Sequence, residues 1–144
     1  MGTRFQYWEE LNVGDELPPL VKKPTTRQLV QYAGASGDFY EIHYDKDFAL
    51  KAGLPGVIVH GLLSGAWLAQ LLTDCFPPLS LRKFGVSYRG MARPGDTITC
   101  KGVVTKKYTQ NGEHYIECDI RSENQEGQTT TIGKATVVLP SREG

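Results

Sequence analysis

The sequence predicts an α+β fold in which an antiparallel β-sheet wraps around one central, buried α-helix. Three observations lead to this prediction: residues 61–75 are apolar on nearly every side, the region after Pro78 alternates between apolar and polar residues, and turn signals divide that region into strands. A helix that is apolar all round belongs inside a protein, and a period of two is typical of strands with one buried face. A small sheet that follows such a helix has to curl around it to cover it.

Length and composition point to one soluble domain. The chain has 144 residues, enough for a single domain spanning 1–144 but too few for two ordinary ones. Its 16 basic and 16 acidic residues give a net charge of zero, so we expect neither nucleic acid nor a membrane as a partner. The helix over residues 61–75 is too short to span a bilayer comfortably, and no long apolar stretch follows the N-terminus. We expect a cytoplasmic protein with no signal peptide.

The three cysteines, Cys75, Cys100 and Cys118, are odd in number and widely spaced. This pattern argues against a disulfide framework and against the paired-cysteine motifs that bind metals. We therefore expect three buried thiols that pack in the core of the protein.

Two short helices are predicted in the first half of the chain, after an irregular entry strand over residues 5–24. Thr25-Thr26-Arg27-Gln28 has the form of a capping box, and apolar residues then recur at helical spacing until Gly34. Asp45 is positioned to cap a second helix, which Gly53 ends. The two helices bracket a polar loop that precedes the long apolar helix.

The second half of the chain predicts a four-strand antiparallel meander. The alternating stretches are residues 84–88, 116–121 and 133–139. The turns are marked by Pro94-Gly95-Asp96, by Asn111-Gly112, which suits a tight hairpin, and by Glu126-Gly127. One buried helix inside such a sheet is a hot-dog architecture. Because its open face and edge strands need cover, we expect a dimer.

A carboxylate and an imidazole stand five residues apart in the loop between the short helices, as Asp38 and His43. Hydration of a double bond conjugated to a thioester needs a base to deprotonate water, an acid to protonate the α-carbon and a donor for the thioester oxygen. Aspartate and histidine can supply the first two functions near neutral pH. The sequence does not decide which of them takes the proton from water.

The donor is predicted at Gly61, where the chain enters the buried helix and its first N–H groups lack partners. A glycine lets a carbonyl oxygen approach that N–H closely, and Leu62 and Leu63 would wall the pocket. A structural interpretation stays open for each of these residues. Gly-Asp after a helix is often a capped turn, and a single histidine such as His60 is more often structural than catalytic.

Residues 32–49 resemble the hydratase motif of the MaoC-like family, in which Ser-Gly-Asp, a variable residue, Asn-Pro, an aliphatic residue and His follow in order. Ser36-Gly37-Asp38 and Ile42-His43 match this motif, whereas Tyr40-Glu41 stands where Asn-Pro is usual. That departure bears on the shape of the loop, since a proline would restrict its backbone. Residues 53–61 and 93–96 also resemble family segments, so the resemblance covers nearly the whole chain.

The resemblance implies an (R)-specific enoyl-CoA hydratase or 3-hydroxyacyl-thioester dehydratase that acts on CoA or acyl-carrier-protein thioesters. It implies catalytic roles for Asp38 and His43, no metal and no redox cofactor. It further implies a homodimer or a dimer of dimers, with a heterodimer as the alternative. We expect the substrate to contact Phe39, Tyr40, His60 and Leu62.

Two alternatives remain open at this stage. A thioesterase on the same fold would use the carboxylate to activate water against the thioester carbonyl, and it would release a free thiol. A non-catalytic acyl-binding subunit would shape the acyl pocket of a catalytic partner, and Tyr40 and Glu41 leave room for this role. The Ser-Gly-Asp context and the spacing of Asp38 and His43 favour hydration over the thioesterase, and the presence of both residues favours an active subunit.

Overall fold

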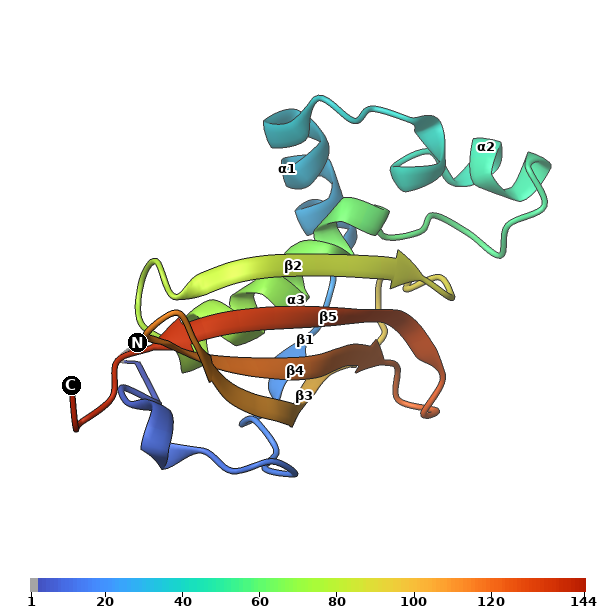
Figure 1. The fold of residues 1–144 in the computed structure, drawn as a ribbon. Helices are drawn as coiled ribbons and strands as arrows, with labels where there is room; N and C mark the ends of the chain where they lie inside the picture. The colour runs from blue at the N-terminus through green and yellow to red at the C-terminus, as the bar shows by residue number, and fades with distance from the viewer. Residues whose placement is uncertain (1–2) are drawn as a thin grey trace.

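One antiparallel sheet and one central helix make up most of the molecule, which we describe from a computed structural model over residues 3–144 (Figure 1). The sheet has five strands in the order β1-β3-β4-β5-β2, and every neighbouring pair is antiparallel. The strands are β1 (Leu20–Lys22), β2 (Leu81–Tyr88), β3 (Ile98–Gln110), β4 (Glu113–Glu123) and β5 (Thr129–Leu139). The predicted α+β, hot-dog arrangement is confirmed.

The central helix α3 (Gly61–Cys75) has the bounds that the apolar stretch predicted. It contacts β1, β2, β3 and β4, so the sheet covers it on several sides. Trp67 and Leu68 in its middle are 3% and 0% exposed. Full burial of side chains of this size contributes roughly 1.5–3 kcal/mol each, which explains why the helix is apolar all round. No helix in the described part of the chain is long and apolar enough to cross a membrane.

The predicted meander is wrong in one connection. β2 pairs with β5 and not with β3, so the segment between β2 and β3 crosses from one edge of the sheet toward the other. Alternation along a strand indicates which side chains face the helix, but it carries no information on which strand lies next to it. Which strand pairs with β2 is decided by how the sheet closes around α3.

The turn between β3 and β4 has the conformation that its sequence predicted. Asn111 and Gly112 have φ angles of 52° and 79°, and the flanking residues Gln110 and Glu113 are paired across the two strands. Two left-handed residues in succession match the right-handed twist of the hairpin, and Asn-Gly adopts this conformation at low cost. The predicted tight hairpin is therefore confirmed.

The two short helices carry the predicted caps. In α1 (Thr26–Ser36), the Thr25 hydroxyl accepts a hydrogen bond from the Gln28 N–H at 3.1 Å. The helix continues two residues beyond Gly34, the predicted end. In α2 (Lys46–Lys51), a carboxylate oxygen of Asp45 accepts a hydrogen bond from the first turn of the helix. Two 3₁₀ turns, η1 (Trp8–Glu10) and η2 (Glu41–His43), complete the secondary structure.

All three cysteines are free and buried, as predicted. Burial raises the pKa of the Cys75 and Cys100 thiols to about 11 and that of the Cys118 thiol to about 12. A thiol with so high a pKa holds its proton at neutral pH and is a poor nucleophile. The cysteines therefore act as small apolar side chains of the core.

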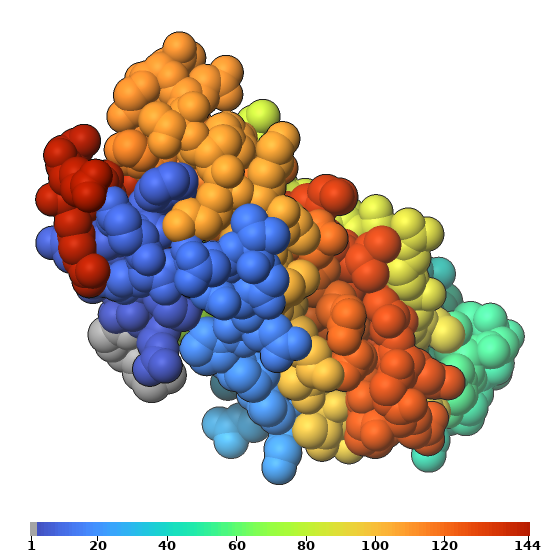
Figure 2. All heavy atoms as spheres, turned by 60° about the horizontal axis from the view of Figure 1, so that its bottom comes forward, coloured from blue at the N-terminus to red at the C-terminus, as the bar shows by residue number. Residues whose placement is uncertain are grey.

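The outer face of the sheet, which points away from α3, is charged and solvated. Figure 2 shows this side of the molecule, with the segment before β1 packed along β3. An open groove of about 940 Å³ crosses it, and Lys101, Asp119, Arg121 and Lys134 are among its lining residues. Neither Asp38 nor His43 lines this groove.

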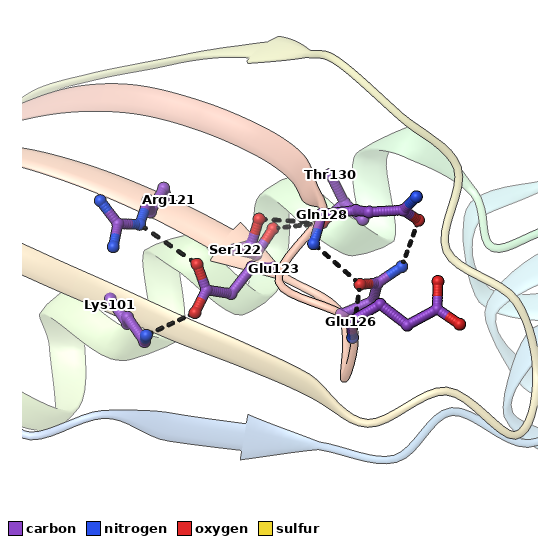
Figure 3. Close-up of polar contacts among 8 residues, drawn as sticks. Lys101, Arg121, Ser122, Glu123, Glu126, Gln128 and Thr130 are labelled. Carbon is purple, nitrogen blue, oxygen red and sulfur yellow. Dashed lines mark hydrogen bonds and ion pairs between the residues drawn. The ribbon is translucent and has the colours of Figure 1, made fainter.

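A polar network joins β3, β4 and β5 near the turn between the last two strands (Figure 3). Glu123 accepts a hydrogen bond from the Lys101 ammonium group and lies 3.5 Å from Arg121 Nε. Beside it, the hydroxyls of Ser122 and Thr130, both buried, share a hydrogen bond of 2.8 Å. The hydrogen bond from Lys101 is the main reason that the pKa of Glu123 lies below its ordinary value of 4.5.

Replacing Glu123 by Gln should lower the free energy of unfolding at pH 7 by about 1 kcal/mol, because an ion pair near the surface contributes little more. A carboxylate with a lowered pKa in the folded state stabilises the protein above its unfolded pKa, and the contribution is lost as the pH falls through the folded value. The difference between wild type and variant should therefore shrink between pH 7 and pH 3, as Glu123 takes up its proton. Urea denaturation at the two pH values measures it. Glu126→Gln, an exposed carboxylate in the same turn, serves as the control, and an equal loss there would contradict the explanation.

Candidate active site

The end of α1 positions Asp38. Gly37 has a φ of 79°, which favours glycine, and its N–H donates to the Ala33 carbonyl to end the helix. In the next residue, Oδ1 of Asp38 accepts a hydrogen bond from the Tyr40 N–H at 3.3 Å. One carboxylate oxygen is thus used to hold the loop. The other oxygen, Oδ2, faces His43, and the side chain remains 45% exposed.

His43 lies at the end of η2, and its ring has a defined tautomer. Nδ1 lies 2.8 Å from the carbonyl oxygen of Ile58. Because a carbonyl only accepts hydrogen bonds, Nδ1 carries the proton and donates it, which leaves Nε2 with a free lone pair in the neutral ring. A main-chain hydrogen bond holds the same two segments together, since the Ile58 N–H donates to the Ile42 carbonyl at 3.0 Å. The buried ring of His43 is therefore fixed with Nε2 pointing toward Asp38.

The two reactive atoms face each other across a short gap. Asp38 Oδ2 and His43 Nε2 are 3.8 Å apart, too far for a direct hydrogen bond. Both atoms are acceptors when the carboxylate is ionised and the imidazole is neutral. One water molecule can donate its two O–H groups to both of them at about 2.8 Å each. The structure thus brings together the two side chains that the sequence singled out.

His60 lies directly against this pair. It is 0% exposed, and its Nε2 lies 3.2 Å from the main-chain carbonyl oxygen of Asp38. Its ring stacks on that of His43 with the centroids 3.8 Å apart, and the ring of Tyr32 lies 4.7 Å away. Burial, followed by the nearby imidazole of His43, lowers the pKa of His60. His60 therefore remains neutral.

Gly61 begins α3 beside these residues. His60 is the N-cap of the helix, and its side chain makes no capping hydrogen bond to the first turn. The first N–H groups of any helix have no partner within it and carry partial positive charge. A Cβ at Gly61 would lie 3.3 Å from ring carbons of Tyr88 in β2. Glycine at this position thus keeps the start of the helix accessible beside Tyr88.

The predicted substrate contacts fall into two groups. Phe39, Tyr40 and Leu62 are 56%, 52% and 68% exposed, and we call these apolar side chains, which lie next to Asp38 or Gly61 in the sequence, the apolar rim. The Tyr40 ring meets the His43 ring edge-on at 6.2 Å, so this departure from the usual motif adds an aromatic wall next to the imidazole. His60, in contrast, is fully buried beneath the pair. The roles of all four residues in substrate binding remain predictions.

Asp38, His43 and His60 also form a group whose potential ligand atoms lie within 4.8 Å of one another. Imidazole lone pairs lie in the plane of the ring, and the two rings are stacked with only 18° between their planes. Lone pairs of stacked rings run side by side and do not converge on one cation as a metal site needs. The chemistry of this group is therefore better suited to proton transfer than to metal binding.

Three residues that contact the site were not assigned to it from the sequence. These are the Ile58 carbonyl at His43, the Tyr32 ring near His60 and the Tyr88 ring against Gly61. Tyr32 is the first residue of the segment that resembles the hydratase motif, but its contact with His60 was not predicted, and Tyr88 fits the strand pattern around it like any packing residue. The Ile58 contact involves the main chain, which leaves no signal in the choice of side chain.

Comparison with known proteins assigns the chain to a family. Residues 12–126 match the family model described as "MaoC like domain". The chain is 26% identical over 145 residues to an (R)-specific enoyl-CoA hydratase of Rhodospirillum rubrum, covering 96% of this chain and 94% of that protein. It also matches fatty acid synthase β subunits, with 36% identity over 74 residues to that of Aspergillus oryzae, or 49% of this chain. The matched part of this chain spans only 4% of the length of that fatty acid synthase subunit.

Solved structures agree with this assignment at the level of the fold. An (R)-hydratase of Pseudomonas aeruginosa superposes with a TM-score of 0.85 at 23% identity, covering 97% of this chain and 89% of that one. The (R)-hydratase of A. caviae superposes with a TM-score of 0.82 at 25% identity, covering 92% and 99%. The match of the family model over most of the chain, together with this shared hot-dog fold, shows that the protein belongs to the MaoC-like family, which includes proteins named as hydratases and dehydratases.

Proposed function

We propose that the protein is a hydro-lyase that reversibly adds water to a trans-2-enoyl thioester and forms the (R)-3-hydroxyacyl thioester. The observation that carries this proposal is the 3.8 Å gap between Asp38 Oδ2 and His43 Nε2, with the His43 tautomer fixed by the Ile58 carbonyl. Two acceptors at this separation suit one water molecule. They lie beside the first N–H groups of α3, where negative charge is stabilised.

The reaction follows from these positions. The water oxygen attacks the β-carbon of the enoyl group, and its proton passes to Asp38 or His43. The electrons of the double bond move toward the thioester carbonyl, whose oxygen gains enolate charge next to the Gly61 N–H. A proton is then transferred from the Asp38 and His43 pair to the α-carbon, and the thioester carbonyl is restored. One hydrogen and one hydroxyl have been added, and both side chains return to their starting states.

The apolar rim supports an acyl chain as the bound group. Phe39, Tyr40 and Leu62 are exposed apolar side chains next to Asp38 or Gly61 in the sequence, and such surface is stabilised when an acyl chain covers it. The relative in Rhodospirillum rubrum is named for a CoA thioester, and one in Arabidopsis thaliana is named for an acyl-carrier-protein thioester. We propose a thioester of either carrier as the substrate.

The test is an assay with purified protein and crotonyl-CoA. We expect the absorbance of the conjugated enoyl group to fall, and chiral analysis to give the (R)-3-hydroxy product with no free thiol. Release of thiol, followed with a thiol reagent, would support the thioesterase instead. A protein that leaves enoyl-CoA substrates of several chain lengths unchanged would contradict the hydro-lyase and support an acyl-binding subunit. A complex of two different proteins from Mycobacterium tuberculosis is among the structural neighbours.

We also propose that two copies form a dimer. β2 is an edge strand, and on its face toward α3 the side chains of Phe84 and Tyr88 are still 38% and 49% exposed. Apolar side chains beside an open strand edge favour association with a second sheet. We expect light scattering at micromolar concentration to give twice the mass of the 16.0 kDa chain. A mass of one chain would contradict the proposal.

A further inference from the structure

We propose that His60 is a positioning residue that fixes Asp38 and His43 relative to each other through one neutral imidazole, an inference that rests on the proposed function. His60 contacts both residues and is the N-cap of the buried helix α3. It is fully buried against the pair, so it acts on the reaction through Asp38 and His43.

The first contact holds the Asp38 loop. His60 Nε2 lies 3.2 Å from the Asp38 carbonyl, and because that oxygen only accepts, Nε2 carries the proton. The Asp38 side chain is 45% exposed, and its own hydrogen bond, to the Tyr40 N–H, lies within the same loop. The bond from His60 thus ties this loop to a different part of the chain, 22 residues further on.

The second contact supports the His43 ring. The two imidazoles stack with centroids 3.8 Å apart and an angle of 18° between the planes. A flat ring at this distance restricts the tilt of its neighbour, and the Ile58 carbonyl restricts its rotation in the plane. His60 itself is attached to a rigid element, since its carbonyl accepts the Ser64 N–H of α3 at 3.1 Å.

The protonation state of His60 follows from its surroundings. Nδ1 is buried and has no hydrogen-bond partner among the described residues. A second proton there would create a buried cation with an unpaired N–H, which is costly. His60 therefore carries its proton on Nε2, whereas His43 carries its proton on Nδ1. The two stacked rings have opposite tautomers.

Three substitutions separate the two contacts. His60→Gln keeps a donor near the Nε2 position but removes the ring, His60→Phe keeps a flat ring but removes the donor, and His60→Leu removes both. Misplacement of a catalytic group by about 1 Å can cost on the order of 100-fold in rate. We expect kcat to fall about 100-fold in the Leu variant and about 10-fold in the Gln and Phe variants. KM should stay within about threefold, because the rim that binds substrate is unchanged.

Thermal melting of each variant separates positioning from simple loss of fold. Gln and Phe variants that are as folded as wild type and still have the lower kcat support the proposal. A Leu variant that is folded and has wild-type kcat overturns it. Activity that falls only in proportion to the folded fraction, with no difference between the Gln, Phe and Leu variants, overturns it as well.

A readout that does not need activity keeps this inference distinct from the proposed function. In protein with ¹⁵N-labelled histidine, we expect the imidazole spectrum at pH 7.5 to show the proton of His60 on Nε2 and that of His43 on Nδ1. In the Leu variant, the His43 ring should tilt and donate less well to the Ile58 carbonyl, so its signals should move toward the average of two tautomers. A wild type that is silent with enoyl-CoA overturns the proposed function alone. A His60 proton on Nδ1, or an unchanged His43 spectrum in the Leu variant, overturns the positioning role.

Discussion

Replacing Asp38 by Asn or His43 by Gln is expected to lower kcat for enoyl-CoA hydration by about 1,000-fold, while the protein stays folded. An amide cannot take a proton from water, and Gln lacks a nitrogen that accepts and returns one. Asp38 is half exposed and His43 makes one main-chain contact, so both changes are compatible with the fold. Loss of enoyl absorbance measures the rate, and circular dichroism verifies the fold.

The double variant distinguishes a shared site from two independent effects. If Asp38 and His43 act on one water molecule, removing both should cost little more than removing the more important one. Glu41→Gln, the same kind of change at an exposed residue of η2, provides the control and should keep kcat within about twofold. Single variants with wild-type rates, or costs that multiply fully in the double variant, would contradict a common site.

Replacing Gly133 by Ala is expected to lower the free energy of unfolding by about 3 kcal/mol, the upper part of the range for an overpacked core. A Cβ at Gly133 would lie 2.3 Å from the Gly85 carbonyl oxygen and 3.0 Å from a methyl group of Val86. The first of these atoms belongs to the main chain of the neighbouring strand, so β2 and β5 would have to separate. Urea denaturation measures the loss.

Gly85→Ala is the matched control for this prediction. Gly85 lies in β2 beside Gly133, yet a Cβ there would meet no atom within 4 Å. We expect its unfolding free energy to change by less than about 1 kcal/mol, since Ala loses less conformational freedom than Gly on folding. Equal destabilisation of the two variants would show that loss of glycine matters in itself and would contradict the close contact at Gly133.

Local features of the fold were predictable because short stretches of sequence determine them. The cap of α1 at Thr25 and the cap of α2 at Asp45 depend on hydrogen bonds three residues away along the chain. The bounds of α3 follow from its apolar stretch, and the hairpin at Asn111-Gly112 follows from two left-handed residues. The neighbour of β2 was not predictable, because pairing with β5 depends on how the whole sheet closes around α3.

The sequence by itself determined which groups the site contains: a carboxylate at Asp38, an imidazole at His43 and a glycine at the start of a buried helix. Only the tertiary structure decided the tautomer of His43 and the position of the Asp38 loop. The tautomer of His43 depends on the carbonyl of Ile58, 15 residues away, and the loop of Asp38 is held by His60, 22 residues away. Contacts at such separations arise from the packing of whole elements, and no local periodicity or spacing encodes them.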